Sequence, residues 1–288
     1  MQRYSAIHSD LHSWLLDRER RDALVALWRE QKETSVSEKI FNEMEAQGLC
    51  EIFSGHRRAL TKKGKLLAYN IEEFRIQVES GKVFDLLNKL NIFSGSVVLD
   101  LGCGGGQTLF ALADRNPSLA LGMDFDLGHL EIAQALSSSF PMKNGRFAFH
   151  QGDGNALPFR DESVDVLICR GVLHYLQITQ ALSEMARVLK PGGHIFIHAL
   201  GLGSFVSQAL KSDLAGRLFG LFGIFNGFFF SLVGKQIAVK YKNHTVRGAF
   251  LSAKSLRMLN KMGIRINRLE RVPYSCFAGY HVLVGEKV

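Results

Sequence analysis

Short apolar runs alternate with amphipathic segments from residue 96 onward. The runs predict strands at residues 96–102, 119–125, 146–153, 164–171 and 194–200. Apolar residues at three- and four-residue spacing predict helices between them, at 108–116, 128–140 and 178–190. Strands that alternate with helices indicate an α/β fold with a parallel sheet covered on both faces.

The pattern changes near the end of the chain. Residues 264–274 and 279–288 are both strand-like, and only a short connection separates them. A connection this short predicts a hairpin. We therefore expect a seven-stranded sheet in which one strand runs antiparallel to the others.

Residues 1–80 have a mostly helical pattern. Helices are predicted over 22–31 and 37–49, with Ser37 as N-cap and Gly48 as the stop signal. Residues 49–69 alternate, turn at Ser54-Gly55, alternate again and enter another helix, and residues 77–93 predict a helix leading into the next domain.

Two helices followed by a two-stranded wing resemble a winged-helix module. Such a module binds DNA in some proteins, but ahead of an α/β domain we favour dimerisation or capping of a ligand site. The expected division is a winged-helix-like domain over 1–80 and an α/β domain over 81–288.

Composition narrows the function classes. The 288 residues are 47% hydrophobic and carry a formal charge of +8, which permits contact with nucleic acid or an anionic membrane without demonstrating it. The four cysteines form no CxxC pair, so we expect no metal site and free thiols suited to a reducing cytoplasm. The first residues lack the apolar core of a signal peptide.

Candidate chemistry follows the first predicted strand, where Asp100 precedes a glycine loop. The loop residues are Gly102, Cys103, Gly104, Gly105 and Gly106. Glycine lets a backbone approach a ligand closely. A carboxylate at Asp100 would repel a pyrophosphate but would accept hydrogen bonds from an ammonium group, and Gln107 stands where a dinucleotide fingerprint needs glycine. A ligand with amino and carboxylate groups fits better.

The other strand ends supply further polar groups, because ligands of open α/β sheets bind beyond the carboxyl ends of the strands. Asp124 can accept bonds from both hydroxyls of a ribose, with Asp126 as a rival. Asp153 can accept from an adenine amino group, Gly154 and Asn155 shape the rim, and Cys169 and Arg170 close over the ligand.

In order and spacing, these motifs resemble those of class I S-adenosylmethionine-dependent methyltransferases, most closely the small-molecule group that includes ubiquinone and menaquinone methyltransferases. The motifs are "VVLDLGCGGG", "GMDFD", "GDGNALPF", "VDVLICRGVLHYL" and "RVLKPGGHIFI". The resemblance covers residues 85–200 strongly. It implies a Rossmann-like sheet and S-adenosylmethionine as cofactor, with S-adenosylhomocysteine as product.

The resemblance also assigns roles to the candidate residues. Asp100 and the glycine loop would face the methionine part, Asp124 the ribose, and Asp153 with Asn155 the adenine. The predicted cofactor-binding set is Asp100, Gly102, Cys103, Gly104, Gly106, Asp124, Phe125, Asp153, Gly154, Asn155, Cys169 and Arg170. Gly154 departs from the alanine common in the family.

Methyl transfer from a sulfonium mainly requires alignment, and a base only where the acceptor must lose a proton. His174, beyond the fourth strand, is the predicted base, with a packed structural histidine as the alternative. His198 is second. Tyr175, Tyr241, His244 and Tyr280 are weaker candidates.

An insertion at about 204–248 is expected to cover the acceptor. Its residues 218–233 carry no charge, and phenylalanine and glycine recur along them, but they are shorter than a bilayer span and Asn226 interrupts them. Three interpretations stay open: a buried core helix or dimer contact, a lid over a lipophilic acceptor, or contact with a membrane interface.

The sequence thus predicts a cytoplasmic, homodimeric methyltransferase for small-molecule biosynthesis. We expect a hydrophobic or aromatic acceptor and favour O-methylation, with carbon and nitrogen open. The first alternative is a DNA-binding regulator with an inactive, cofactor-sensing methyltransferase-like domain. The second is an RNA methyltransferase, which the missing NPPY-type motif and the absence of a recognisable RNA module disfavour.

Overall fold

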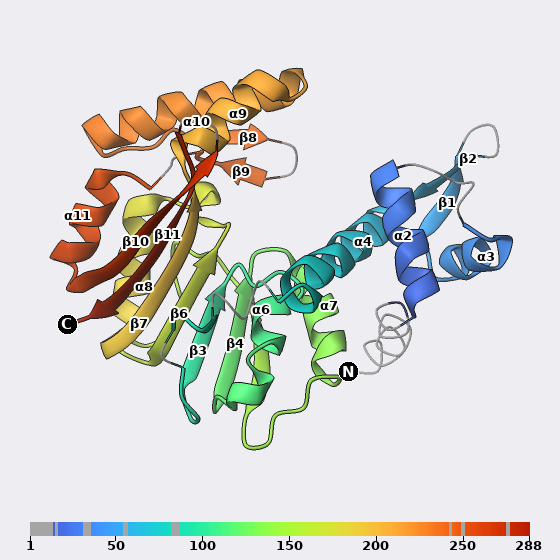
Figure 1. The fold of residues 1–288 in the computed structure, drawn as a ribbon, viewed down its shortest axis with the longest axis horizontal. Coiled ribbons are helices and arrows are strands. Elements are labelled where there is room, and N and C mark those ends of the chain that lie inside the picture. Colours follow the sequence, from blue (N-terminus) through green and yellow to red (C-terminus); the bar gives the residue numbers. More distant parts are fainter. Residues whose placement is uncertain are drawn as a thin grey trace.

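The structure is a computed structural model (Figure 1). It describes residues 14, 17–30, 36–53, 57–81, 87–90, 92–241, 244–248, 251–274 and 277–288. The predicted turn at Ser54-Gly55 and the fourth cysteine, Cys276, lie outside these residues.

A seven-stranded sheet forms the centre of the molecule, in the order β10-β11-β7-β6-β3-β4-β5. Its strands are β3 (Val97–Leu101), β4 (Leu119–Asp124), β5 (Arg146–Gln151), β6 (Val164–Arg170), β7 (Leu189–Leu200), β10 (Ile264–Tyr274) and β11 (Phe277–Lys287). Strands β3 to β7 pair in parallel, whereas β11 is antiparallel to both β7 and β10. The predicted Rossmann-like fold with one antiparallel strand is confirmed.

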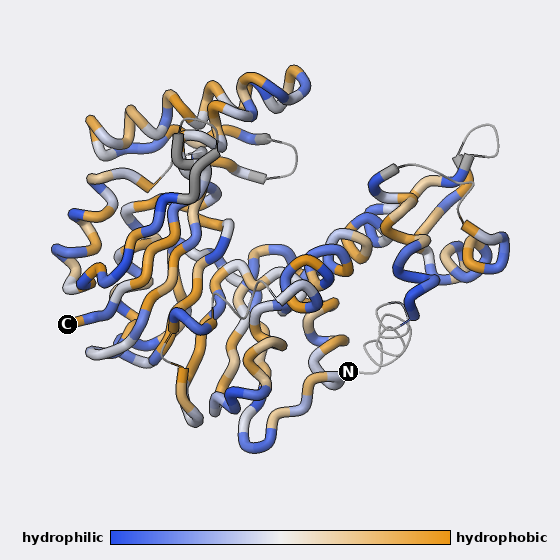
Figure 2. Tube along the Cα trace, viewed as in Figure 1, coloured by the Kyte–Doolittle hydropathy of each residue, from blue (hydrophilic) through white to orange (hydrophobic). Residues whose placement is uncertain are grey.

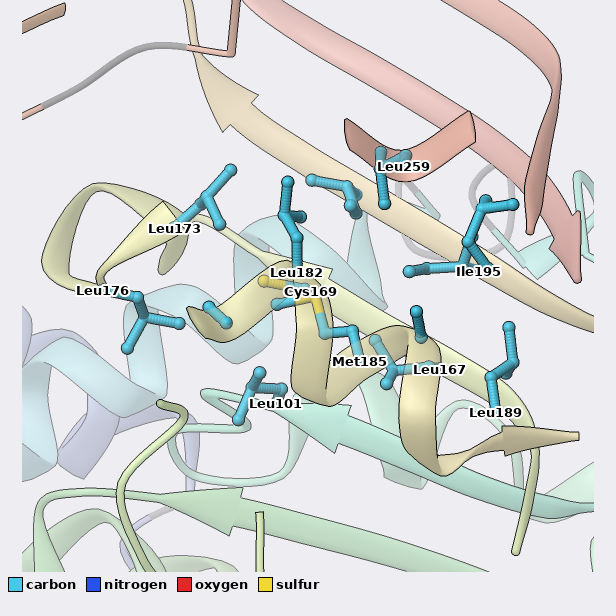
Figure 3. Packing of buried hydrophobic residues seen from close by; sticks show 14 of the residues in the cluster. Leu101, Leu167, Cys169, Leu173, Leu176, Leu182, Met185, Leu189, Ile195 and Leu259 are labelled. Atoms are coloured by element: carbon cyan, nitrogen blue, oxygen red, sulfur yellow. The ribbon is translucent and has the colours of Figure 1, made fainter. Parts of the chain in front are cut away.

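The sheet is buried on both faces, as its apolar strands require. Along β6, Leu167 and Cys169 join one hydrophobic cluster, while Val166 and Ile168 join another. This follows from the alternation of side chains along a strand. Figure 3 shows the first cluster, where Leu182 and other apolar side chains pack against Leu167 and Cys169 on one face of the sheet.

Helices cover the two faces. Helices α8 (Ile178–Val188) and α11 (Ala253–Lys261) contribute to the first cluster. On the other side, the short α6 (Gln107–Phe110) contacts β4, and α7 (Leu127–Ser137) contacts both β4 and β5; η3 (Ala113–Arg115) follows α6.

The elements described in full in the N-terminal part are two helices, a hairpin and a long helix. These are α2 (Arg18–Glu30), α3 (Glu38–Ala46), β1 (Cys50–Phe53), β2 (Arg57–Leu60), α4 (Lys62–Phe74) and the π-helix η2 (Arg75–Glu79). Ser37 caps α3 as predicted, its side chain accepting from the backbone N–H of Ile40. The winged-helix identity of this part stays a prediction.

This N-terminal part shares a hydrophobic core with the sheet domain. Ile71 of α4 and Ile132 and Leu136 of α7 belong to one buried cluster. Helix α4 therefore lies directly against the α/β domain (Figure 1).

The continuous helix predicted over 77–93 is wrong. Helical structure ends at Glu79, and Ser80 and Gly81 form a turn. Gly81 has a φ of 79°, a left-handed conformation that ends a helix. Residues 82–86 and 91 lie outside the described part.

The insertion after β7 folds into two packed helices and a small hairpin. These are α9 (Leu202–Lys211), α10 (Leu214–Val233), β8 (Val239–Tyr241) and β9 (His244–Val246). The glycine stripe of α10 allows a close approach, since a Cβ at Gly220 would lie 2.4 Å from the backbone N of Ala209 in α9. The two helices lie side by side at one end of the molecule (Figure 1).

Candidate functional site

The glycine loop after β3 explains why the sequence places glycines there. The φ angle is 75° at Gly102, 54° at Gly104 and 86° at Gly106, all in the region that side chains disfavour. A Cβ at Gly102 would also lie 2.0 Å from Cγ2 of Val172. The Gly102 N–H donates to the carbonyl of Met123 at 2.7 Å, which ties the loop to β4.

Asp100 lies at the base of this loop and is 2% exposed. Burial raises the pKa of its carboxyl to about 7, and Asp124 also raises it, whereas the charge of Arg170 and a hydrogen bond from Thr108 lower it. A buried carboxyl near the midpoint of its titration is well placed to bind a cationic group, which would favour its ionised form.

Asp124 ends β4, and its carboxylate is held from two sides. Oδ2 accepts from the N–H of Gly104 at 2.9 Å, and Oδ1 accepts from the N–H of Asp126 at 2.9 Å. Each carboxylate oxygen keeps a further acceptor site for a hydroxyl. Its rival Asp126 is the N-cap of α7, with Oδ1 accepting from Gly128 at 2.8 Å. Asp126 therefore has a structural role, and Asp124 is the better candidate for the ribose.

Two exposed residues flank this acid. Phe125 is 74% exposed, although it is a large apolar side chain. Asp153 is exposed in the loop after β5, and its Oδ1 accepts from both N–H and Nδ2 of Asn155. Asn155 in turn accepts from the N–H of Gln177 at 2.7 Å, so it joins two strand-end loops.

Gly154 is buried beside the same loops. A Cβ there would lie 3.0 Å from Cδ1 of Leu176 and 3.3 Å from Cδ1 of Leu101. The alanine common in the family would therefore force Leu176 to shift.

The two cysteines of the predicted site do not present their thiols to a ligand position. Cys169 is fully buried in the hydrophobic cluster of Figure 3, close to Leu182, and burial raises its pKa to about 12. Cys103 is 4% exposed, and burial raises its pKa as well. Contact of either residue with a ligand would involve the backbone.

Arg170 ends β6 in the middle of the site. Its positive charge acts on Asp100 and also lowers the pKa of His198. It is partly exposed. Asp100 can bind the ammonium group of an amino acid, and the guanidinium of Arg170 can bind its carboxylate. The site therefore has one partner for each of the two charges.

Two partly buried imidazoles lie near the carboxyl ends of β6 and β7. His174 belongs to η4 (Leu173–Tyr175) and His198 to β7, and the Nδ1 atoms of both are buried without a hydrogen-bond partner among the described residues. Burial lowers the pKa of each to about 4, so both are neutral at physiological pH.

The four weaker candidates for the base form two pairs, one beside the two histidines and one in the β8–β9 hairpin. The ring of Tyr175 lies 4.0 Å from that of His174, and the ring of Tyr280 stacks on His198 at 4.9 Å, measured between centroids. Tyr241 and His244 pair across the β8–β9 hairpin. Their side chains lie outside what the structure describes.

Helix α4 also contributes to the site, which was not predicted from the sequence. Asn70 is 2% exposed, and its Oδ1 and backbone carbonyl accept from Nε2 of Gln107 at 3.2 and 3.3 Å. A Cβ at Gly105 would lie 2.4 Å from Asn70 Oδ1, so α4 lies directly against the glycine loop. The signal was available, since Asn70 is a polar residue on the apolar face that includes Leu67.

Tyr69 brings a hydroxyl from the same helix toward the site. Its ring meets His129 edge-on at 5.8 Å between centroids. Desolvation raises the pKa of Tyr69 to about 12, and Tyr175, Asp124 and Arg170 also act on it. Helix α4 therefore covers one side of the strand ends.

Comparisons with known proteins agree with the fold. The family model described as "Methyltransferase domain" matches residues 99–197. A demethylmenaquinone methyltransferase of Lactobacillus johnsonii is 32% identical over 187 residues, which cover 62% of this chain and 71% of the relative. The chain belongs to the S-adenosylmethionine-dependent methyltransferases of class I, and the cofactor of this family is S-adenosylmethionine.

Other matches are shorter or more distant. Methyltransferase GfsG of Streptomyces halstedii is 33% identical over 113 residues, 39% of this chain and 40% of the relative. The chain spans about two fifths of the length of the first curated relatives it matches. A solved structure from Listeria monocytogenes, described as an S-adenosylmethionine-dependent methyltransferase, has a TM-score of 0.54 at 16% identity and covers 73% of this chain and 99% of its own; it supports the fold.

The residues at the strand ends fit this cofactor. Asp100 is a buried acid that gains from an ammonium partner, the Asp124 carboxylate retains acceptor sites for hydroxyls, and the exposed ring of Phe125 offers an apolar surface to a base. Within the described residues no group of three or more His, Cys, Asp or Glu side chains could hold a metal ion.

Proposed function

We propose that this protein transfers the methyl group of S-adenosylmethionine to a small apolar acceptor. The observation that carries the proposal is the pairing of Asp100 and Asp124 around one glycine loop, with the neutral imidazole of His174 beyond the end of β6, the strand next to β3. The two acids would bind the cofactor, and the imidazole would accept a proton from the methyl acceptor.

The cofactor would be held by residues at the ends of four strands. Asp100 binds the ammonium group of the methionine part, and Arg170 binds its carboxylate. Asp124 accepts from the ribose hydroxyls. Phe125 packs on the adenine, while Asp153, held by Asn155, accepts from its amino group. Tyr69 and Asn70 of α4 close the side of the site, which supports a capping role for the N-terminal part. Its dimerisation is a separate prediction.

The bound cofactor supplies an electrophilic methyl group, so the protein has little covalent chemistry to perform. His174 accepts the hydrogen bond of the acceptor's hydroxyl and takes its proton as the new bond forms. Burial keeps the imidazole neutral and able to accept. The preference for an oxygen acceptor rests on this proton transfer.

The insertion supports an apolar acceptor. Asn226, 0% exposed in α10, donates to the carbonyl of Arg247, and the N–H groups of Arg247 and Gly248 donate to the carbonyl of His174 at 3.1 and 3.0 Å. The phenylalanine-rich helix is therefore connected to the proposed base, as a lid would be. The Lactobacillus johnsonii relative is named a demethylmenaquinone methyltransferase.

The alternative of a DNA-binding regulator gains no support. In a winged helix the second helix would meet DNA, and here α3 carries Glu38, Glu43 and Glu45 against a single lysine. Arg58 of the neighbouring hairpin forms a bidentate pair with Glu38. An acidic helix opposes contact with phosphates.

Calorimetric titration with S-adenosylhomocysteine tests the cofactor site, followed by a screen of phenols, quinols and amines as methyl acceptors. We expect micromolar binding that Asp100→Ala abolishes, and turnover with apolar hydroxyl compounds. Wild-type protein that does not bind the product would contradict the proposal. Turnover of highly polar acceptors alone would contradict the lid.

A further inference from the structure

Helix α10 presents a continuous apolar stripe to solvent. Six residues spaced four and three apart are between 51% and 83% exposed: Leu214, Leu218, Leu221, Phe225, Phe228 and Leu232. Figure 2 shows hydrophobic colour recurring along this helix at the outer end of the molecule. An apolar stripe of this length on a free surface marks an interaction site.

The opposite side of α10 is fixed to the protein. Gly216, Gly220, Gly223 and Asn226 are buried, and Asn226 Oδ1 accepts from the N–H of Ile237 at 2.9 Å. By length and composition α10 is the one helix in the described part of the chain that could cross a membrane, and a third of its apolar window is buried. One side of α10 packs against α9 and is bonded to the protein through Asn226. The helix therefore cannot be surrounded by lipid, and only its exposed side can contact an apolar layer.

The segment of the chain that contains this helix carries the whole net charge. Residues 201–262 contain nine Lys and Arg and one acid, Asp213, whereas the other 226 residues contain 26 of each sign. Among the nine, Lys211 and Arg217 near the start of α10 and Lys235 just after its end are exposed. An apolar stripe with basic residues at both ends is the pattern of a helix that lies in a membrane interface.

We infer that α10 docks the protein onto the surface of an anionic lipid bilayer, with its six-residue stripe in the acyl boundary and its basic ends on the headgroups. A second copy of the chain is a poorer occupant. In an isologous pair either end of α10 would meet an end that is also basic, and Asp213, the N-cap, is the only acid in the insertion.

Docking has a consequence for the reaction, which rests on the proposed function. The docked helix is connected through Asn226 and Arg247 to His174. The acceptor site is thereby held beside the layer in which an apolar acceptor dissolves.

Flotation of the full chain with vesicles tests this inference without cofactor or acceptor. We expect binding to phosphatidylcholine vesicles that contain phosphatidylglycerol, and little binding to phosphatidylcholine alone. Arg217→Gln with Lys235→Gln should weaken binding about fivefold for each charge removed. Leu221→Gln with Phe225→Gln should weaken it about tenfold or more, since two apolar side chains leave the acyl boundary.

Matched controls remove the same groups elsewhere on the surface. Lys62→Gln with Lys65→Gln removes two exposed charges of the N-terminal part, and Ile52→Gln with Phe93→Gln replaces side chains that are 61% and 55% exposed. Both pairs should bind vesicles like the wild type.

Equal binding to neutral vesicles, or α10 variants that bind like the controls, would overturn the inference. So would a sedimentation result in which the wild type is a dimer that the Leu221 and Phe225 changes dissociate, with no vesicle binding. Because vesicle binding is measured without methyl transfer, its failure leaves the proposed function standing, and a failure of methyl transfer leaves the docking result intact.

Discussion

The backbone N–H of Gly104 donates a 2.9 Å hydrogen bond to Oδ2 of Asp124. This bond joins the loop after β3 to the acid that ends β4, two elements 20 residues apart. The acid proposed for the ribose therefore also shapes the loop proposed for the methionine part.

Replacement of Asp124 should remove both the acceptor for the ribose hydroxyls and the bond that shapes the glycine loop. In Asp124→Ala the ribose hydroxyls lose a charged acceptor and the Gly104 N–H loses its partner. Loss of two charge-assisted hydrogen bonds predicts an affinity for S-adenosylhomocysteine about 100-fold lower, measured by calorimetry.

The neighbouring acid provides the control. Asp126→Ser keeps an N-cap on α7 and removes only the charge, so the affinity should remain close to that of the wild type. If Asp126→Ser weakens binding as much as Asp124→Ala, the assignment of the ribose acid is wrong.

Asp100 should make cofactor binding depend on pH. Burial holds the pKa of its carboxyl at about 7, and an ammonium ligand favours the ionised form. Binding below pH 7 must therefore release a proton, and affinity should rise about tenfold per pH unit up to about pH 7 and then level off. Titrations in buffers of different ionisation enthalpy measure the released proton, and Asp100→Asn should release none.

The raised pKa of Asp100 also makes the stability of the ligand-free protein depend on pH. The ordinary pKa of an aspartate is 3.8, so between about pH 4 and pH 7 the folded chain keeps a proton that the unfolded chain has lost. The stability from this group is complete below pH 4 and is lost as the pH rises to about 7. Asp100→Asn should thus raise the melting temperature at pH 8 and have little effect at pH 4. A gain of equal size at both pH values would contradict the assigned titration.

The strands and the acids at their ends could be predicted from the sequence because both follow from local patterns. Alternation placed β3 to β7, and the motif spacing placed Asp100 and Asp124 at their ends. The side on which a side chain lies is harder to predict, because it depends on strand phase. Cys169 is one residue from Arg170, yet its thiol points into the core.

Contacts between distant segments could not be predicted. Asn70 reaches the glycine loop across the boundary between the N-terminal part and the sheet domain, and no local pattern encodes that docking. The break at Gly81 was missed for a similar reason. The apolar spacing continues on both sides of it, although its backbone turns left-handed.

His174 and His198 can be distinguished by kinetics. If His174 takes the proton, His174→Asn should lower kcat by at least about 100-fold while leaving the affinity for S-adenosylhomocysteine unchanged. His198→Asn should cause a smaller loss. Since burial lowers the pKa of His174 to about 4, neither histidine should cause an inflection in the rate profile between pH 5 and pH 8. An inflection near pH 6.5 that disappears in His174→Asn would mean that the imidazole is solvated during turnover.

The contact between Gly105 and Asn70 can be tested by a double-mutant cycle. Gly105→Ala places a Cβ 2.4 Å from Asn70 Oδ1 and should destabilise the protein by about 1–3 kcal/mol in urea unfolding. Asn70→Ala removes the clashing amide, so Gly105→Ala should cost far less in that background. Equal costs in both backgrounds would show that α4 does not press on the glycine loop.

The lid can be tested through its closest helix contact. A Cβ at Gly220 would lie 2.4 Å from the backbone N of Ala209 and 2.5 Å from the carbonyl oxygen of Phe205, and backbone atoms cannot move aside. Gly220→Ala should therefore push α10 away from α9, raise KM for an apolar acceptor and leave cofactor affinity unchanged. Leu218→Ala, on the exposed side of the same helix, should leave both values unchanged with a water-soluble acceptor. If Gly220→Ala changes cofactor affinity and KM equally, α10 acts on the whole fold and not as a lid.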